Sequence, residues 1–487
     1  MSKEKQGIWS NPLLSSKISS PDVKPPEMLI GYLIGPFGAL LSSGIFTSFL
    51  NQYFTDVLRL DTAFLSGLQL VSTIFIVAAN LIVGQLIERT KTLAGKARPW
   101  VLLSALTLSV ASLLMFVVPF EGTAKLVWVA IAYNLYYSVA YPIYNTANST
   151  LIPVSTRNSG QRASLASFTN IAGLGVMGVG SMVFPILVAN VLETNQTRWF
   201  LVMLGVAIFT ALTIYLQFSF TRERVTEESM NNAAAEQTAG APSIGDQLKA
   251  VTSEKWWWIV ILFYLFFQCS GAIKNGSMAY FCQWVVDSAD IPGGWGTVQT
   301  ILAVLGAIPM AVAAVFVVPL SNKFGKRMVV FAGMVVGVVG GIIAGLGNGA
   351  IIPTAIGVAL KCLGSAPAAY LILAMLADVI DHIEFKNNLR TDGLTMSIYS
   401  SIMVAATPIM NAVFMALLAV AGYVAPPEGA EAAAQITQTV DTQVAIGISY
   451  IWIETVAYAV CALLMLVWTV EKNLPEEQKA IAARKKS

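Results

Sequence analysis

Long apolar stretches recur along the whole chain and are separated by short polar turns. A helix needs about 20 apolar residues to cross the hydrocarbon core of a bilayer, and the stretches in this chain reach that length. The pattern therefore predicts twelve membrane-crossing helices, at residues 28–50, 63–87, 100–119, 126–149, 164–190, 199–220, 256–286, 297–320, 328–348, 351–378, 394–424 and 446–470.

Residues 372–390 show how one of these crossings ends. An apolar helical run passes without interruption into a cluster of charges, namely Asp378, Asp381, Glu384, Lys386 and Arg390. Charges belong where water returns, and Lys and Arg collect on the cytoplasmic side of a membrane. The tenth crossing is therefore predicted to end in the cytoplasm, and the sidedness of the others follows by counting.

The basic residues agree with this topology along the whole chain. Of the 29 Lys and Arg residues, only Arg59, Lys125 and Arg198 fall in predicted outer segments, and Lys274 and Lys361 fall inside crossings. All the others lie in predicted inner segments. We expect an integral protein of the cytoplasmic (plasma) membrane with both termini in the cytoplasm.

The longest polar insertion divides the chain into two similar halves. We expect a cytoplasmic tail at 1–27, a six-helix bundle at 28–220, a linker at 221–254, a second six-helix bundle at 255–470 and a tail at 471–487. A Gly-Lys turn follows the second crossing of each half, at Gly95-Lys96 and Gly325-Lys326. Duplicated bundles that rock about a midplane site are the architecture of secondary transporters.

Composition excludes several classes of protein. The chain is 56% hydrophobic and 11% charged, whereas soluble domains carry about 25% charged residues. The net charge of +2 gives no support for nucleic-acid binding. Four cysteines in apolar segments and a single histidine, His382, give no metal site and no nucleophile–His–acid set. We therefore expect no enzyme activity and no cofactor.

Four motifs occur in order at particular places in the crossings. They are Tyr53-Phe54-Thr55-Asp56-Val57 at the end of the first, Gly95-Lys96-Ala97-Arg98-Pro99-Trp100 before the third, Leu151-Ile152-Pro153 after the fourth, and Ala377-Asp378-Val379-Ile380-Asp381-His382-Ile383-Glu384-Phe385-Lys386 after the tenth. Together they resemble the glycoside–pentoside–hexuronide cation symporters, the melibiose-permease-like branch of the major facilitator superfamily. The resemblance covers nearly the whole chain. It implies an all-α membrane protein of the major facilitator fold, with twelve transmembrane helices in two six-helix bundles around a central cavity, and a small-molecule substrate.

The positions by which this family holds its cation and its sugar are changed in this chain. At the aligned positions, the cation-binding aspartates of helices two and four are replaced by Ile76, Asn80 and Asn145. The sugar-binding acid of helix one, the arginine of helix five and the buried lysine of helix eleven are replaced by Leu40, Asn170 and Val404. Sodium needs oxygen ligands and usually charge compensation. We expect no melibiose-permease-type sodium site, with Asn80 and Asn145 as neutral candidates for contacting a coupling proton or cation.

Three charged residues are predicted to lie well inside crossings: Lys274 in the seventh, Lys361 in the tenth and Glu454 in the twelfth. Each falls toward the outer side of its segment's midpoint, by about 5–6 Å at 1.5 Å per residue, so the three should share one depth. We expect Lys274, with Asn275, to face the cavity and to hold an anionic substrate group or change protonation. The alternative is a lysine satisfied by helix carbonyls or by Glu454. For Lys361 and Glu454, a structural ion pair between crossings ten and twelve and a coupling role both stay open.

Neutral polar side chains are further candidates for binding substrate hydroxyls, although such groups also hold helices together. They are Tyr141, Asn145, Asn148 and Asn170 in the first half and Tyr399 and Ser400 on the eleventh crossing. Charges at the inner ends of the crossings are expected to form ion pairs that latch the two halves in one conformation. These gating candidates are Asp378, Asp381, Lys386, Arg89, Lys96 and Arg98.

Three functions fit these observations. The first is an alternating-access transporter of a glycoside, a sugar or an acidic sugar, either proton-coupled or facilitative. The second is the same fold carrying an amphiphile or another organic anion, such as a lysolipid. The third is a membrane receptor or scaffold that transports nothing. Two equivalent halves favour the first two, because a scaffold needs no alternating access.

Overall fold

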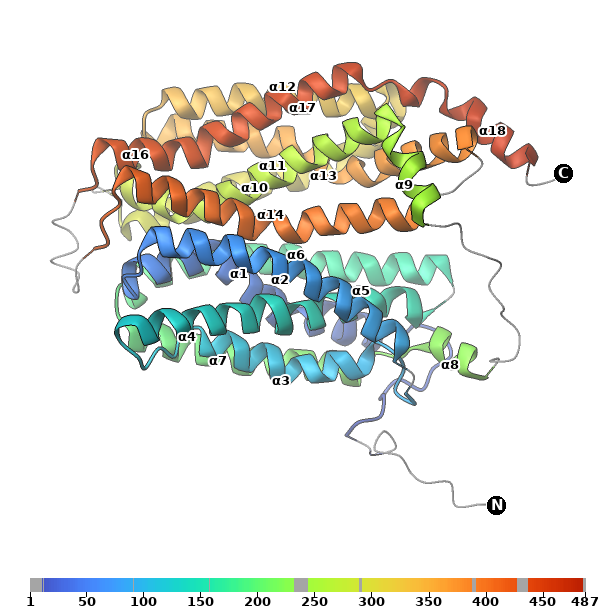
Figure 1. The fold of residues 1–487 in the computed structure, drawn as a ribbon, viewed down its shortest axis with the longest axis horizontal. Coiled ribbons are helices and arrows are strands. Elements are labelled where there is room, and N and C mark those ends of the chain that lie inside the picture. Colours follow the sequence, from blue (N-terminus) through green and yellow to red (C-terminus); the bar gives the residue numbers. More distant parts are fainter. Residues whose placement is uncertain are drawn as a thin grey trace.

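The computed structural model describes Asn11 and residues 13–90, 92–156, 158–231, 244–288, 291–387, 391–426 and 437–484. Within these residues the chain forms long helices that run side by side along the longest axis of the molecule (Figure 1). The helices coloured blue to green form one side of the molecule, and those coloured yellow to red form the other. The described part of the chain begins and ends at the same end of the molecule, which we call the terminus end (Figure 1).

The first half contains the helices between Glu27 and Ser219. They are η2 (Glu27–Ile34), α1 (Gly35–Gln52), η3 (Tyr53–Val57), α2 (Thr62–Arg89), α3 (Arg98–Leu114), α4 (Gly122–Asn134), η4 (Leu135–Ala140), α5 (Tyr141–Ser155), α6 (Ser159–Leu187), η5 (Val188–Leu192) and α7 (Gln196–Ser219). The segments η2 to η5 are π-helical turns that continue the neighbouring α-helices.

The second half contains the helices between Lys255 and Val467. They are α10 (Lys255–Trp284), α11 (Gly294–Phe324), α12 (Lys326–Leu346), α13 (Ile351–Asn387), α14 (Asp392–Ala421), α16 (Val440–Gly447), η6 (Ile448–Trp452) and α17 (Ile453–Val467). The predicted linker includes α8 (Arg224–Asn231) and α9 (Ile244–Thr252), and the predicted tail includes η7 (Val470–Lys472, a 3₁₀ turn) and α18 (Leu474–Arg484).

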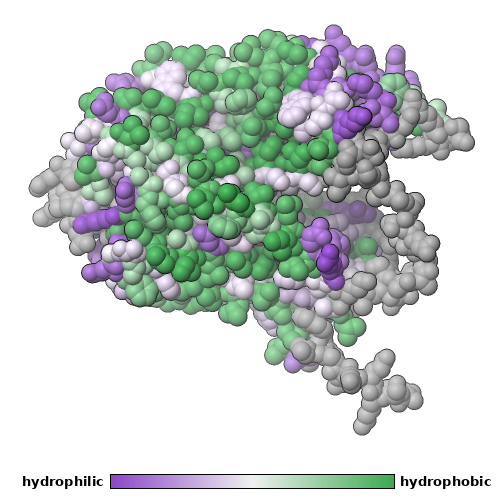
Figure 2. Space-filling view, viewed as in Figure 1, coloured by the Kyte–Doolittle hydropathy of each residue, from purple (hydrophilic) through white to green (hydrophobic). Residues whose placement is uncertain are grey.

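Ten helical segments of the described chain are long and apolar enough to cross a membrane. They correspond to ten of the twelve predicted crossings. The predicted third and fifth crossings are helical as α3 and α6 with η5, but the apolar helices found there are shorter, at Arg98–Leu114 and Val183–Leu192. On the face that Figure 2 shows, hydrophobic residues cover the middle of the molecule and hydrophilic residues gather toward both ends; we call this apolar surface the hydrophobic belt.

The hydrophobic belt explains the exposure pattern of the helices. On α2, Leu65 and Ile87 are buried, whereas Leu70, Ile74 and Ile82 are 56%, 71% and 58% exposed. Soluble proteins rarely expose contiguous apolar surface of this kind. Lipid tails are as apolar as these side chains, so the outer faces of the helices need no protein partner.

The two halves repeat one another at the Gly-Lys turns. The Glu223 carboxylate accepts hydrogen bonds from the backbone N–H groups of Lys96, Ala97 and Arg98 at 2.8, 2.8 and 2.7 Å, at the start of α3. In the second half, Glu471 accepts hydrogen bonds from the backbone N–H groups at the start of α12, from Lys326 at 2.8 Å and from Arg327 at 3.2 Å. A carboxylate satisfies the unpaired N–H groups of a helix start and complements its dipole. The duplication therefore extends from the turn to the acid that binds it.

Each turn needs glycine for the same reason. Gly95 and Gly325 have φ values of +107° and +84°, in the region that glycine adopts at no steric cost. A Cβ atom on Gly95 would lie 2.3 Å from the Glu223 carboxyl carbon, and one on Gly325 would lie 3.0 Å from a Glu471 carboxylate oxygen. The absence of a side chain thus lets the carboxylate reach the helix start.

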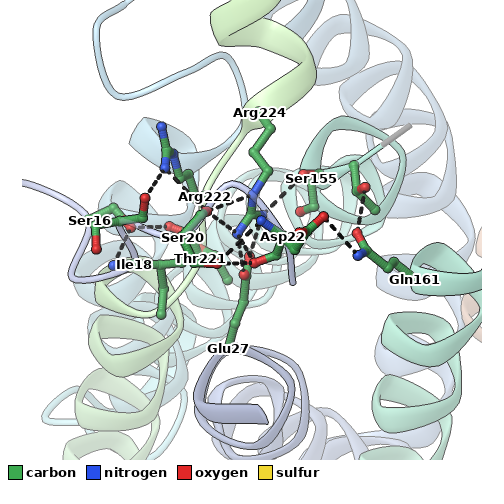
Figure 3. A network of polar contacts seen from close by, with 12 residues as sticks. Ser16, Ile18, Ser20, Asp22, Glu27, Ser155, Gln161, Thr221, Arg222 and Arg224 are labelled. Atoms are coloured by element: carbon green, nitrogen blue, oxygen red, sulfur yellow. Dashed lines mark hydrogen bonds and ion pairs between the residues drawn. The ribbon is translucent and has the colours of Figure 1, made fainter. Parts of the chain in front are cut away.

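A buried ion pair fastens the terminus end of the first half (Figure 3). Arg224 donates to Glu27 at 2.7 and 3.1 Å and to the carbonyl oxygen of Ser155 at 3.2 Å. Arg222, beside it, donates to the carbonyl oxygen of Ser19 at 2.8 Å. Hydrogen bonds to Glu227 raise the pKa of Arg222 above its ordinary value. The start of the first helix, the end of α5 and the chain after α7 are thereby joined.

Candidate functional site

The two halves meet along three helix pairs. α2 packs against α14, α6 against α11, and α1 against α10. At the end opposite the termini, which we call the closed end, three polar pairs join the halves. Gln52 donates to Gln283 at 2.6 Å, the hydroxyls of Thr55 and Tyr280 lie 2.7 Å apart, and Tyr423 donates to Asp56 at 2.6 Å.

At the terminus end the halves separate. Figure 2 shows a hollow between them, on the side of the molecule where α8 and α9 lie in Figure 1. The interface is therefore asymmetric along the long axis, because polar contacts close one end while the other is open. This is the geometry of one state of an alternating-access carrier.

The three charged residues predicted inside the membrane form one cluster in the second half. Lys274 Nζ on α10 lies 3.2 Å from Glu454 Oε1, and Lys361 on α13 is bonded to Glu454 Oε2. The Tyr458 hydroxyl, one turn along α17, donates to Glu454 Oε1 at 2.7 Å. Three helices thus bring two ammonium groups and one carboxylate together, as their common predicted depth suggested.

The two lysines of this cluster have different surroundings. The Lys361 side chain is 3% exposed and also points to the carbonyl oxygens of Tyr450 and Ile451, at 3.4 and 3.3 Å. These carbonyls belong to η6, and a π-helical turn changes the hydrogen bonding of a helix locally. The Lys274 side chain is 23% exposed. The geometry favours a packing role for Lys361, and Lys274 is the more exposed of the two lysines.

The predicted asparagines of the first half have varied surroundings. Asn80 donates to the carbonyl oxygen of Ile76 in its own helix at 2.8 Å, and Asn148 accepts from Gln217 at 2.6 Å. Asn145 is half-buried on α5. Tyr141 stacks with Tyr136, with ring centroids 5.9 Å apart. Asn170 lies on α6, but its side chain is outside the part of the chain that the structure describes.

The remaining predicted binding residues lie on α10 and α14. Asn275 and Ser400 are exposed. Tyr399 stacks on Tyr264 of α10 with ring centroids 4.2 Å apart. Stacking of this kind fixes the two helices relative to one another, and a substrate-binding role for Tyr399 stays a prediction.

The predicted latch between the halves is not formed in this conformation. In the second half, Asp378 binds Lys326 at 2.6 Å, Lys386 binds Glu254 at 2.7 Å, and Asp381 accepts from Gln478 at 2.9 Å; the partners of these three lie on the same half or its flanking segments. The halves are apart at the terminus end, so each charge finds a partner on its own side. The contacts described here are on one side of the interface, and a latch across it in another conformation stays a prediction.

The basic gating candidates of the first half follow the same rule. Lys96 binds Glu88 at 2.8 Å, and Arg98 donates to the carbonyl oxygen of Phe218 at 2.9 Å. Arg98 is also buried, with its guanidinium over the Phe218 ring at 4.6 Å. Arg89 is exposed. Arg98 thus belongs to the packing of α3 against α7, and a latch involving Lys96 or Arg89 in another conformation stays a prediction.

The sequence interpretation missed the neutral residues that join the halves. Besides the three pairs at the closed end, buried amides meet where α1, α2 and α14 approach α10: Gln69 donates to Asn51 at 2.7 Å, and a Cβ atom on Gly276 would lie 2.2 Å from Asn411 Oδ1. In the sequence, these residues are recognisable as polar side chains within apolar crossings, and they occur in both halves. Among the described residues, no group of three or more His, Cys, Asp or Glu side chains could hold a metal ion.

Comparisons with known proteins agree with the geometry. Residues 31–472 match the family described as MFS/sugar transport protein. The isoprimeverose transporter of Lactiplantibacillus pentosus is 28% identical over 91% of this chain and 89% of its own length, and the glucuronide carrier protein homolog of Escherichia coli is 21% identical over 82% and 84%. A solved peptide transporter in complex with alafosfalin has a TM-score of 0.62 at 12% identity, over 96% of this chain and 98% of that one, which shows the fold alone. The chain belongs to the MFS/sugar transport protein family, with the major facilitator fold.

Proposed function

We propose that this protein is a secondary transporter that moves a glycoside or sugar across the plasma membrane by alternating access, without a melibiose-permease-type sodium site. The observation that carries the proposal is the asymmetry of the interface, with polar contacts at one end and a hollow at the other. Two similar halves that meet in this way are suited to exposing a central site to one side at a time. The named relatives, one for isoprimeverose and one a glucuronide carrier homolog, support a sugar-type substrate.

The orientation we propose places the terminus end in the cytoplasm. The basic residues of the Gly-Lys turns, the linker and both tails favour this side. The hollow then opens inward, and the contacts of Gln52, Thr55 and Asp56 close the outer face. The conformation described here is accordingly inward-facing.

Sodium independence is supported by the chemistry of the neutral replacements. Asn80 and Asn145 bring amide oxygens to the aligned positions, without the negative charge that usually compensates a bound cation. Glu454 is engaged by Lys274 and Lys361, so this carboxylate is not available as a cation ligand. Transport coupled to protons or driven by the substrate gradient alone fits these residues.

Lys274 is the proposed contact with the substrate in the second half. Its side chain is partly exposed, while the cluster beneath it is buried. A charged hydrogen bond contributes about 1.5–3 kcal/mol. A hydroxyl or carboxylate of the solute would gain this energy by taking over the Lys274 ammonium from Glu454. The Glu454 carboxylate would stay paired, because Lys361 also binds it.

The test is uptake of isoprimeverose into proteoliposomes that hold the purified protein. We expect Lys274→Ala to lower uptake at least about tenfold, the loss of a contact worth roughly 1.4 kcal/mol or more, with folded protein retained. Lys255→Ala, a change of an exposed lysine at the start of the same helix, is the matched control. Sodium should leave the apparent affinity unchanged. Absence of uptake of any tested saccharide would overturn the transport proposal, and tightening by sodium would overturn sodium independence.

A second candidate function is transport of an organic anion, and the same cluster favours it. With both lysines protonated and Glu454 ionised, the cluster carries one net positive charge. An anionic head group, including that of a lysolipid, would be held by Lys274. The test is whether glucuronate or a lysolipid inhibits sugar uptake, which measures how well the site binds anions. Inhibition by the lysolipid alone would favour this second function.

A further inference from the structure

A second cavity lies between the halves at the closed end, away from the hollow at the terminus end. It has a volume of 620 Å³, within the usual range of ligand pockets of about 300–1,000 Å³. Gln52, Asp56 and Glu193 line it from the first half. Residues 283–284, residues 286–288, Trp295 and Gln443 line it from the second half. Lys274 is not among the lining residues.

The chemistry of this cavity differs from that of the Lys274 cluster. Its described lining holds three carboxylates, four glutamines and three tryptophans, and no Lys or Arg: Gln52, Asp56, Glu193, Trp199, Gln283, Trp284, Asp287, Trp295, Gln438 and Gln443. Trp199 is buried in the core, while Trp284 and Trp295 are partly exposed. Indole faces pack against apolar ring surfaces, and amides and carboxylates accept hydrogen bonds from hydroxyls. These are the groups that recognise a neutral saccharide, and the described lining offers an anion no Lys or Arg side chain, although Glu193 is paired with Arg198 at 3.7 Å.

One side chain of the cavity wall lacks the partner that burial requires. Gln52 is 4% exposed, and its Nε2 donates to Gln283. Its Oε1 has no hydrogen-bond partner among the described residues. A buried acceptor without a donor costs about 1–3 kcal/mol. The oxygen is enclosed in this conformation, so a ligand hydroxyl would supply the missing bond once the Gln52–Gln283 contact opens.

We propose that this cavity is an outer vestibule that binds a neutral saccharide or glycoside before the closed end opens. The proposal rests on the transport function proposed above and adds a second binding site to it. The partly exposed indoles of Trp284 and Trp295 supply the apolar contact, and Gln52 supplies a hydrogen-bond acceptor. The lining carboxylates Asp56, Glu193 and Asp287, without a lining Lys or Arg among the described residues, favour a neutral ligand over an anionic sugar, whatever the Lys274 site accepts.

The vestibule shares residues with the contacts that close this end. Gln52 and Asp56 both line the cavity and bond across the interface, to Gln283 and Tyr423. Hydroxyls of a bound saccharide can replace Gln283 and Tyr423 as the hydrogen-bond partners of Gln52 and Asp56. Ligand in the vestibule therefore weakens the closure, which links arrival of the solute to opening.

The test is protection of a cysteine from a maleimide. Ser288 lines the cavity, and Ser288→Cys changes one atom of its side chain. Thr123, exposed at the start of α4 and outside the cavity lining, gives the matched control Thr123→Cys. In the purified full-length protein, we expect isoprimeverose at ten times its dissociation constant to slow labelling of Ser288→Cys about tenfold, by simple occupancy, and to leave Thr123→Cys unchanged. Labelling of the wild-type protein corrects for the four native cysteines.

Three further arms decide what the protection means. Glucuronate at the same concentration should not protect, Trp295→Leu should weaken protection by isoprimeverose, and Lys274→Ala should preserve it. Unchanged labelling with isoprimeverose, equal protection by glucuronate, or loss of protection in Lys274→Ala would each overturn the vestibule. Uptake without protection would remove the vestibule alone. Protection without uptake would leave the vestibule and remove the transport function.

Discussion

At the scale of single residues, the Lys274–Glu454–Lys361 cluster is the feature that most departs from ordinary membrane packing. Glu454 is fully buried, and its two oxygens are shared among two lysines and Tyr458. A charge at mid-bilayer costs at least about 2.5–3.5 kcal/mol without partners. Each lysine therefore stabilises the carboxylate, and the carboxylate stabilises both lysines.

Glu454→Gln should destabilise the protein strongly. It leaves Lys361 buried and without its counter-charge, and breaking a buried ion pair costs about 3–5 kcal/mol. We expect a clear fall in the thermal unfolding temperature of the detergent-solubilised protein. Glu476→Gln, which changes an exposed acid on α18, is the control. An unfolding temperature equal to that of the control would show that water or lipid head groups compensate Lys361.

At the scale of elements, the carboxylate-bound helix starts carry the internal duplication. Glu223 follows the last helix of the first half, and Glu471 follows the last helix of the second. Each returns to the start of the third helix of its own half, α3 or α12. Each half is thus fastened at the terminus end by its own chain.

Glu223→Ala and Glu471→Ala should have similar effects. Each leaves backbone N–H groups at a helix start without an acceptor, at a cost of about 1–3 kcal/mol. Thermal unfolding of the two variants measures this cost, with Glu476→Ala as the exposed control. A large loss for one variant and none for the other would contradict the equivalence of the two turns.

The lengths and positions of the helices could be predicted because hydrophobic length fixes them. The second crossing was predicted at 63–87, and α2 runs over Thr62–Arg89. The helices α9 and α18 were missed, since both are short and lie in segments that polar composition marks as linker and tail. Such helices form by packing at the membrane end, and periodicity over one or two turns is too weak a signal for them.

The depth of the charged cluster could be predicted, but the partners at the closed end could not. Depth follows from position in a crossing, as it did for Lys274, Lys361 and Glu454. The pairing of Gln52 with Gln283 depends on how two helices far apart in sequence are rotated toward each other, and hydropathy contains no such information. Asn80 shows a further limit, because its Nδ2 donates to a carbonyl of its own helix, a contact that hydropathy does not reveal.

At the scale of the whole molecule, the balance between the closed and open ends decides which side the solute reaches. The closed end depends on a few polar pairs in addition to helix packing. A carrier must break these contacts in each cycle, so each is expected to be modest in strength. Small changes there should shift the population of conformations rather than unfold the protein.

Tyr423→Phe should favour opening of the closed end. It removes the hydroxyl that bonds the Asp56 carboxylate, and a hydrogen bond to a charged group contributes about 1.5–3 kcal/mol, so the equilibrium should shift roughly tenfold or more. Spin labels at Glu121 and Asp441, exposed on opposite halves at this end, would report a larger fraction of long distances. Tyr370→Phe, on an exposed tyrosine of α13, should leave the distribution unchanged. An unaltered distribution in Tyr423→Phe would show that helix packing alone holds the end shut.

The location of the charged cluster in one half has a consequence for energetics in a living cell. The cluster moves with its half, while the water-filled path alternates between the two faces of the membrane. When the path switches sides, the positive charge of the cluster experiences a different part of the membrane potential. Moving one full charge through 100 mV changes its energy by about 2.3 kcal/mol. The conformation in which the unloaded protein rests should therefore depend on voltage, even where no ion accompanies the solute.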